Sequence, residues 1–402
     1  MHQLWGETYL LPQKKFKFHV ATFIKHYKRY FKSPLRTIKR QVIRLLFKPK
    51  LAYLYQLYIL MIKRKKWSKV KKLIIKASET TSLRKDKRLS IEFAHAAERV
   101  GLYELSTELS VINAKLLRRN KTTDWNGEDL SDKHLCITFK EGDKQGLAFG
   151  LRMAGYINEV SKQAAQTQLI VEKRLVPIFF RTLPHVKVLP YPERCDLNTD
   201  RLVTSNMVNL WQNLGTSEKQ IRSRFTPLKN NKIKSSEIRE QYLSSCEIKR
   251  PLVGISWHSS HFGKDLPDIH DWLNFICSFD CTFVNIQYGD IKSDVLHFEN
   301  AIQERFINDI SVNQLISMDD FCNQLGALDA VVSISNTGAH LSSAMGIPTI
   351  IIRDDWFRRA WPVLSSKTPW YPNTITIGKN GRQWSDVFND VQQTLQNMII
   401  QP

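Results

Sequence analysis

Two kinds of hydrophobic spacing divide the chain. Between about residues 51 and 120, apolar side chains recur every three or four positions, the period of a helix with one buried face. The polar breaks between these stretches are short. The pattern predicts four helices, over Leu51–Ile62, Trp67–Ala77, Leu89–Val100 and Tyr103–Leu117.

After Asp124 the pattern changes to short apolar runs that alternate with helical stretches, which is typical of an α/β layer fold. This first series predicts strands over His134–Phe139, Thr167–Val171 and Val186–Leu189, and helices over Ala148–Val160 and Leu175–Arg181. Residues 196–250 are polar. We expect them to be helical and to join two parts of the fold.

A second series begins at Pro251. It predicts strands over Leu252–Trp257, Thr282–Gln287, Ala330–Ser335 and Thr349–Ile352, and helices over Ile269–Phe279, Asp319–Leu325, Gly338–Met345 and Ser385–Met398. Two α/β series joined by a polar stretch indicate two Rossmann-like lobes with a cleft between them. We therefore divide the chain into a basic amphipathic arm (1–50), a helical, repeat-like region (51–120), a first Rossmann-like lobe with its helical linker (121–250) and a second Rossmann-like lobe (251–402).

The excess positive charge is confined to one segment. Of the 59 Lys and Arg residues, 21 lie between Thr8 and Ser78, where there is no Asp or Glu, and the other 38 are balanced by 38 acidic residues. The formal net charge of +21 therefore belongs to the N-terminal part. Aromatic and aliphatic residues lie among these charges, which favours an anionic membrane surface as the partner of residues 14–76. A solvated helical face or a protein-partner site is the alternative, and nucleic acid is the least favoured partner.

The rest of the composition is ordinary for a globular protein of 402 residues, with 42% hydrophobic and 24% charged residues. No apolar run reaches the roughly 18 residues that a spanning helix needs, and the N-terminus lacks the pattern of a secretory signal. Scattered cysteines suit a reducing compartment. Cys277 and Cys281 are spaced as zinc ligands sometimes are, but without a second pair nearby we expect two core thiols and no metal. We expect a cytoplasmic protein, peripheral on the inner face of the membrane if the basic segment binds lipid.

The strongest local signal follows the predicted strand Ala330–Ser335. The strand ends in Ser335-Asn336-Thr337-Gly338 and a helix begins at once, so free backbone N–H groups and the helix dipole face the strand's carboxyl end. Asn336 and Thr337 add side-chain donors, and Gly338 leaves room for a phosphate beside the backbone. An ordinary capped helix is the alternative interpretation. His340 either donates to a phosphate or packs beneath the turn.

Two further strands of the same lobe end in polar loops. Leu252–Trp257 runs into His258 and Ser259, and Lys264 follows within reach of a diphosphate. After the strand over 282–287, Tyr288 is placed to stack on a base, and Asp290 either binds a ribose hydroxyl or caps a helix. Because ligands of open α/β sheets bind at the carboxyl ends of the strands, three such loops in one lobe predict a ligand site.

Four segments, in this order, resemble the heptosyltransferase-like family and its tetratricopeptide-repeat-linked relatives. They are Trp125-Asn-Gly-Glu-Asp-Leu, Val284-Asn-Ile-Gln-Tyr-Gly-Asp, Asp329-Ala-Val-Val-Ser-Ile-Ser-Asn-Thr-Gly-Ala-His-Leu-Ser-Ser-Ala-Met-Gly-Ile-Pro and Pro369-Trp-Tyr-Pro. The helical region also resembles a degenerate tetratricopeptide-type array. The resemblance implies the GT-B fold of two Rossmann-like lobes, and a glycosyltransferase that uses a nucleotide sugar as co-substrate without a metal or other cofactor.

Position by position, the resemblance implies that the segment Ser335–Gly338 and His340 border the nucleotide diphosphate. Trp257 and the loop after it would form the other wall, and Lys264 is the nearest candidate for the family's lysine. In the first lobe the strand over 134–139 runs into a loop with Glu141 and Asp143. Either carboxylate is a candidate for the base that takes the acceptor's proton, and a solvated charged turn is the alternative. The family's loop commonly reads Gly-x-Gly-Asp, whereas an alignment through Phe149 puts Gln145 at that Asp. Either Asp143 acts from a shifted position, or activity is weakened or lost.

The sequence therefore predicts a metal-independent glycosyltransferase that moves a hexosyl or heptosyl group from a nucleotide sugar to a saccharide acceptor. The acceptor would be lipid-linked or part of a surface polysaccharide such as capsule or lipopolysaccharide. The alternative is a decayed transferase fold that acts as a helical-repeat binding scaffold. The departure of the first-lobe loop from the family's Gly-x-Gly-Asp pattern favours this alternative.

Overall fold

The structure is a computed structural model that describes residues 57–58, 60–62, 64, 66–80, 83, 86–116, 124–139, 146–197, 199–259, 265–354 and 361–400. The predicted basic arm, most of the predicted helix Leu51–Ile62, and the candidate residues Glu141, Asp143 and Lys264 lie outside them. The chain divides into two compact units, Met1–Ser90 and Ile91–Pro402.

Three predicted helices of the N-terminal region are confirmed, as α4 (Trp67–Ser78), α6 (Lys87–Arg99) and α7 (Tyr103–Leu116). In α4 the apolar residues recur on one face, and that face is buried through Trp67, Val70, Leu73, Ile74 and Ala77. Gly101, between α6 and α7, has a φ of 78°, the left-handed conformation that commonly follows a helix and favours glycine. The repeat-like character of this region stays a prediction.

The first sheet of the second unit has four parallel strands in the order β3-β2-β1-β4. They are β1 (His134–Thr138), β2 (Gln166–Val171), β3 (Lys187–Pro190) and β4 (Leu202–Asn206). The helices that follow them are α8 (Gly146–Arg152), α9 (Ala154–Ser161), α10 (Val176–Thr182) and α11 (Met207–Leu214). After α11 come α12 (Glu218–Ser223) and α13 (Lys232–Ser244), which lead to the second sheet.

Two expectations for this part of the chain are wrong. Residues 196–250 are not all helical, because β4 pairs in register with β1 along its whole length. Strand β4 is an edge strand that is mostly half-buried, so it lacks the apolar run by which the other strands were found. The single helix predicted over Ala148–Val160 is two helices that meet at Met153. The break turns two glycines toward different neighbours: a Cβ on Gly150 would lie 2.9 Å from the Phe139 ring, and Gly155 faces the backbone of Arg224.

The second sheet has six parallel strands in the order β10-β9-β8-β5-β6-β7. They are β5 (Leu252–Ser256), β6 (Thr282–Asn285), β7 (Phe306–Ile307), β8 (Ala330–Ile334), β9 (Thr349–Arg353) and β10 (Thr374–Gly378). The connecting and final helices are α14 (Ile269–Cys277), α15 (Lys292–Ile302), α16 (Met318–Leu325), α17 (Thr337–Met345) and α18 (Trp384–Ile400). The predicted α14, α16, α17 and α18 are confirmed, whereas α15, β7 and β10 had not been predicted.

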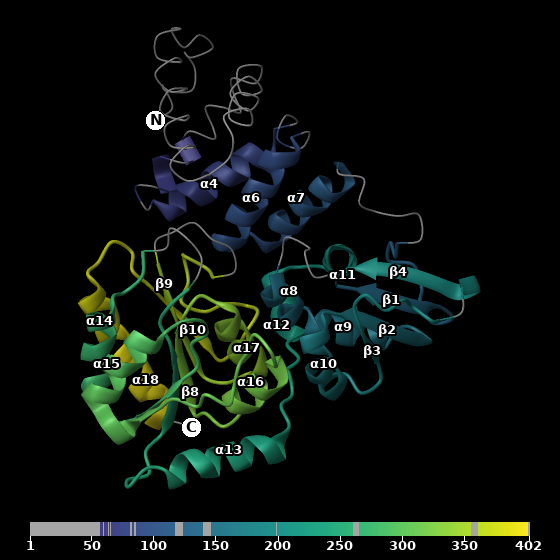
Figure 1. The fold of residues 1–402 in the computed structure, drawn as a ribbon. Coiled ribbons are helices and arrows are strands. Elements are labelled where there is room, and N and C mark those ends of the chain that lie inside the picture. Colours follow the sequence, from purple (N-terminus) through teal and green to yellow (C-terminus); the bar gives the residue numbers. More distant parts are fainter. Residues whose placement is uncertain are drawn as a thin grey trace, which may run out of the picture. The chain divides into compact units, whose positions relative to one another are not determined.

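Each face of this sheet packs into a different hydrophobic cluster. Val332 and Ile334 of β8 join residues of α14, α15 and α18, whereas Val331 between them joins residues of α16 and α17. Alternation along a strand places successive side chains on opposite faces, so a continuous apolar run is what a strand covered on both faces requires. In Figure 1, α14, α15 and α18 lie on one side of this sheet and α16 and α17 on the other.

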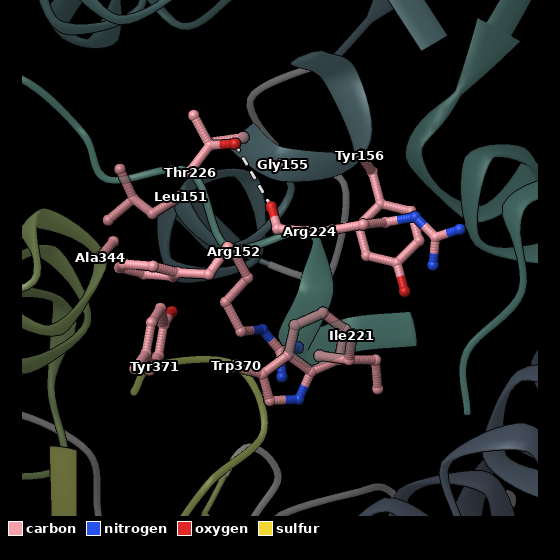
Figure 2. A pocket seen from close by; sticks show the side chains of 12 residues that line it. Leu151, Arg152, Gly155, Tyr156, Ile221, Arg224, Thr226, Ala344, Trp370 and Tyr371 are labelled. Carbon is pink, nitrogen blue, oxygen red and sulfur yellow. Dashed lines mark hydrogen bonds between the residues drawn. The ribbon is translucent and has the colours of Figure 1, made fainter. Parts of the chain in front are cut away.

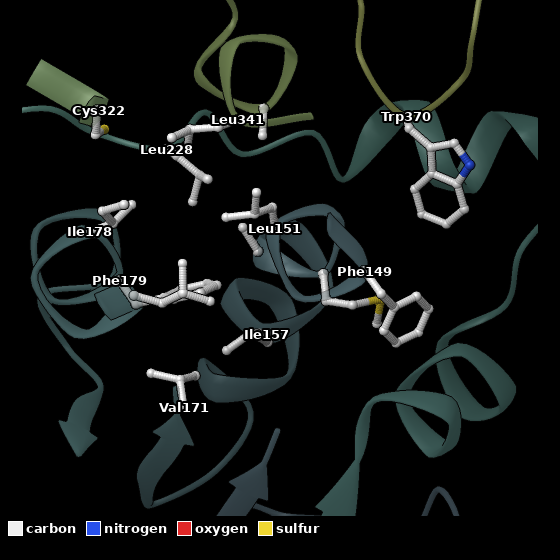
Figure 3. Packing of buried hydrophobic residues seen from close by; sticks show 14 of the residues in the cluster. Phe149, Leu151, Ile157, Val171, Ile178, Phe179, Leu228, Cys322, Leu341 and Trp370 are labelled. Atoms are coloured by element: carbon white, nitrogen blue, oxygen red, sulfur yellow. The ribbon is translucent and has the colours of Figure 1, made fainter. Parts of the chain in front are cut away.

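The cluster on the α17 side continues into the first lobe (Figure 3). Leu151 of α8, Ile178 of α10 and Leu341 of α17 belong to it together with Leu228 from the connecting segment. The backbone N–H of Leu228 also donates to the carbonyl of Ala344, at 2.9 Å. The two lobes therefore share one apolar core on this side.

Three buried thiols should react poorly with alkylating agents. Burial raises the pKa of Cys136, Cys281 and Cys322 well above the usual value of a thiol, so little of each is thiolate at pH 8. Cys277 is exposed, which corrects the expectation of two core thiols at 277 and 281. With iodoacetamide at pH 8, peptide mapping should find Cys277 labelled in the native protein and the three buried cysteines labelled only after denaturation. Labelling of Cys322 as fast as that of Cys277 would contradict the buried environment.

Candidate functional site

The point where the strand order reverses lies between β5 and β8. From β5 the chain moves to β6 and β7 on one side, and it then returns to place β8, β9 and β10 on the other. Ser256, the last residue of β5, pairs with Ser333 of β8, so the loops that leave these two strands begin next to each other. The connections diverge here, and ligands of open α/β sheets bind at such a reversal point, outside the carboxyl ends of the strands.

The turn from β8 into α17 presents a helix N-terminus at this edge. Asn336 is the N-cap residue: its side-chain oxygen accepts a hydrogen bond from the backbone N–H of Ala339, at 2.9 Å. The cap leaves the N–H groups of Thr337 and Gly338 without an intrahelical acceptor, as in the first turn of any helix. These N–H groups and the helix dipole favour an anion.

Side chains from three strand ends are hydrogen-bonded to one another here. Asn336 Nδ2 donates to Ser256 Oγ at 2.7 Å, and Ser256 Oγ donates to Gln287 Oε1 at 2.7 Å. The same oxygen of Gln287 accepts from the backbone N–H of His258 at 2.8 Å, and Gln287 Nε2 donates to the carbonyl of Tyr288 at 2.9 Å. The loops after β5, β6 and β8 are thus joined through a short polar network.

The loop after β5 contributes backbone groups and small side chains to the carboxyl edge of the second sheet. His258 is exposed and Ser259 is buried. Trp257 is 4% exposed and lies in the core, where its ring packs edge-on against Phe298 and its indole N–H donates to Asp294 Oδ2 at 2.8 Å. The buried indole therefore fixes the start of this loop to the core. Any contact of Trp257 with a ligand would be through its backbone.

Beneath the turn, His340 packs among aromatic rings. It is 6% exposed, stacks on Trp361 at 4.4 Å between centroids, and its Nδ1 lies 3.1 Å from the Tyr371 hydroxyl. Trp361 also donates from its indole N–H to Ser335 Oγ, at 2.8 Å. Of the two roles that the sequence left open for His340, this geometry matches packing beneath the turn. Burial also raises the pKa of the Tyr371 hydroxyl, which stays protonated.

The remaining predicted residues of the edge have different surroundings. Thr337 is partly exposed at the first position of α17, whereas Gly338 is buried and a Cβ there would come within 3.1 Å of the Phe321 ring. After β6, Tyr288 is partly exposed and Asp290 is exposed. Gly289 between them has a φ of 98°, which glycine adopts without strain. Lys264 and the first-lobe residues Glu141 and Asp143 lie outside the described part of the chain.

The prediction omitted Gln287 from the site, although the network depends on it as well as on Ser256. Ser256 is 1% exposed and Gln287 is 8% exposed. A buried amide directly after an apolar strand is a signal that could have identified Gln287, because buried polar groups need partners nearby.

A small pocket lies elsewhere between the lobes (Figure 2). It is lined from one side by α8 and α9 and from the other by the end of α17 and by Trp370 and Tyr371. Arg152 reaches into this region, with its guanidinium carbon 4.8 Å from the Trp370 ring centre. None of the predicted site residues lines the pocket, although the hydroxyl of Tyr371, which lines it, lies 3.1 Å from His340 Nδ1.

The described residues contain neither a cluster of metal-binding side chains nor a helix that could span a membrane. No group of three or more His, Cys, Asp or Glu residues is arranged to hold a metal ion. Among the same residues, no helix combines the length and the apolar character that a membrane span needs.

Comparison with known proteins finds one relative by sequence and several solved structures with a similar fold. No family model matches the chain. Protein FlbA of Caulobacter vibrioides is 24% identical over 264 residues, which are 62% of this chain and 44% of FlbA, so the match spans less than half of that relative. A glycosyl transferase family 9 protein from Veillonella parvula is similar in structure, with a TM-score of 0.50 and 9% identity over 69% of this chain and 100% of that one. The ADP-heptose LPS heptosyltransferase II of Escherichia coli has a TM-score of 0.46 and 13% identity over 67% and 99% of the two chains. This chain therefore has the two-lobed GT-B glycosyltransferase fold, and its predicted likeness to heptosyltransferase-like proteins is confirmed at the level of the fold.

Proposed function

We propose that this protein is a glycosyltransferase that takes a sugar from a nucleotide-sugar donor and transfers it to a saccharide acceptor. The observation that carries the proposal is the turn from β8 into α17, because it places a capped helix N-terminus at the reversal point of the sheet. The N–H groups of Thr337 and Gly338 and the helix dipole would stabilise the diphosphate, on which negative charge develops as the sugar leaves.

The other parts of the proposal concern residues around this turn. Thr337 and Ser259 add hydroxyl groups, Tyr288 would stack on the base, and Asp290 would bind the ribose. Lys264 would neutralise diphosphate charge, which together with the helix end would make a metal unnecessary.

Asp143 is the first candidate for the base that deprotonates the acceptor, with Glu141 as the second. The acceptor would be lipid-linked, and the basic residues between 14 and 76 would hold the protein at an anionic membrane surface.

A panel of nucleotide sugars tests the donor site. In a thermal-shift screen of ADP-, GDP-, UDP- and CMP-sugars, one class should raise the melting temperature. A ligand at a hundredfold excess over its Kd stabilises the native state by about 2.7 kcal/mol. Thr337→Val should reduce the shift, whereas Asp143→Asn should keep the shift and abolish sugar transfer. If no nucleotide sugar shifts the melting temperature and a protein partner binds instead, the decayed scaffold would be the correct interpretation.

A further inference from the structure

The polar network at the carboxyl edge has a fixed direction of donation. Asn336 donates to Ser256, and Ser256 has a single proton, which it gives to Gln287. The Gln287 oxygen also accepts from the backbone N–H of His258, and its NH₂ group donates to the carbonyl of Tyr288. The hydrogen bonds are therefore donated in one direction, from the cap of α17 through the end of β5 to the loop after β6.

This direction depends on an amide at each end. If position 336 could only accept, the Ser256 proton would have to turn toward it and the contact with Gln287 would lose its donor. Turning the Gln287 amide over would supply a donor to Ser256, but it would also set its NH₂ group against the N–H of His258. Because a buried donor or acceptor that loses its partner is costly, no alternative arrangement of these groups is equally stable.

The network is also electrically neutral. Asn336 caps α17 without the negative charge that an aspartate would place at the same position, although both residues are good N-caps. A carboxylate there would neutralise the positive end of the helix and repel an incoming diphosphate. A neutral cap leaves the helix end available to an anionic ligand.

From these observations we infer that Asn336, Ser256 and Gln287 are positioning residues, which hold the loops after β5, β6 and β8 at one spacing so that their N–H groups converge on the diphosphate. This inference rests on the proposed function. It assigns to Asn336 and Gln287 an action through the loops that carry the ligand contacts. It also states why amides, and not carboxylates, stand at positions 336 and 287.

Two matched pairs of variants test it. Asn336→Asp is compared with Asn231→Asp, since Asn231 caps α13 in the same way but lies outside the network. Gln287→Leu is compared with Gln314→Leu, since both glutamines are 8% exposed and Gln314 only donates to the carbonyl of Ile286. In each pair the same residue change is made at an N-cap or at an equally buried glutamine, although Gln287 makes three side-chain hydrogen bonds and Gln314 makes one.

The first measurement needs no ligand. Amide hydrogen exchange of peptides that cover residues 254–259 and 285–290 should be faster in Asn336→Asp and in Gln287→Leu than in the wild type. Asn231→Asp should leave the exchange of these peptides unchanged, and Gln314→Leu should not expose the N–H of His258. Unchanged exchange at residues 254–259 in both network variants would overturn the inference, whatever the protein binds.

The second measurement is calorimetric titration with ADP, GDP, UDP and CMP. If the wild type binds one of them, Asn336→Asp and Gln287→Leu should weaken that binding by about tenfold or more, and the two controls should bind within about twofold of the wild type. Network variants that bind as tightly as their controls would refute a positioning role. Absence of binding by the wild type would instead refute the proposed function, and the exchange experiment would still decide whether the network positions the loops.

Discussion

Replacing Glu98 with leucine should lower the free energy of unfolding by about 3 to 5 kcal/mol. Glu98 of α6 and Arg152 of α8 form an ion pair at 2.5 Å, with side chains only 6% and 5% exposed. The Arg152 guanidinium also lies over the rings of Phe149, Trp211 and Trp370, at 5.6, 5.8 and 4.8 Å from their centres. Without Glu98, the cation would remain buried with the rings as its main compensation, which is worth much less than a carboxylate. Urea denaturation at pH 7 measures the loss.

A double variant separates the charge from the packing. Glu98→Leu with Arg152→Met replaces both charges by apolar side chains, and it should recover most of the stability, because a buried ion pair is often matched by hydrophobic residues of similar volume. The control is the exposed pair Arg222 and Glu218, 2.7 Å apart with side chains 43% and 57% exposed. Glu218→Leu should cost less than about 1 kcal/mol. If Glu98→Leu costs no more than Glu218→Leu, the pair is not buried as described.

Gly155→Ala should destabilise the protein by about 3 kcal/mol or more, at the upper end of what overpacking costs. A Cβ at this position would lie 1.7 Å from the carbonyl oxygen of Arg224 and 2.7 Å from its carbonyl carbon, so backbone and not a flexible side chain would have to move. A shift of the Arg224 backbone would also break hydrogen bonds that its side chain makes. Its guanidinium donates to the carbonyl of Leu214 and, with Nε at 2.5 Å, to the Glu159 carboxylate. Thermal unfolding followed by circular dichroism measures the effect.

Asn158→Ala, one turn further along α9, is the control for this substitution. Asn158 makes a single, long hydrogen bond, from Nδ2 to Thr226 Oγ1 at 3.3 Å, and alanine removes atoms there without adding any. We expect a change of about 1 kcal/mol or less. Equal losses for Gly155→Ala and Asn158→Ala would mean that α9 and the segment after α12 are not in close contact.

The sequence predicts the strands of the second sheet well because both of their faces are buried. Strands β5, β8 and β9 are buried at every position, and such strands appear as uninterrupted apolar runs. Strand β4 shows the converse, since Val203, Thr204 and their neighbours form an edge that needs no apolar run. Strand β7 has only two residues, which is too short for any periodicity to appear.

For the site, the sequence predicts which edge of the sheet carries it. It does not predict which side chains at that edge are buried and which are open to a ligand. The turn at 335–338 could be found because cap, glycine and helix are adjacent in the chain. The burial of the Trp257 ring against Phe298 could not, because these residues are 41 positions apart and nothing local distinguishes a core tryptophan from one that faces a ligand. The same holds for Glu98 and Arg152, whose pairing depends on the packing of α6 against the first lobe.

The apolar core that α8 and α17 share has a consequence for how this protein folds. Leu151 and Leu341 bury area that belongs to neither sheet alone, and the Arg181–Asp319 ion pair joins α10 to α16 beside them. A fragment that ended between α13 and β5 would expose that surface to water, at a cost of roughly 25 cal/mol for each Å² of apolar area. We therefore expect the two sheets to unfold together as one cooperative unit, and neither half to persist as an independent domain.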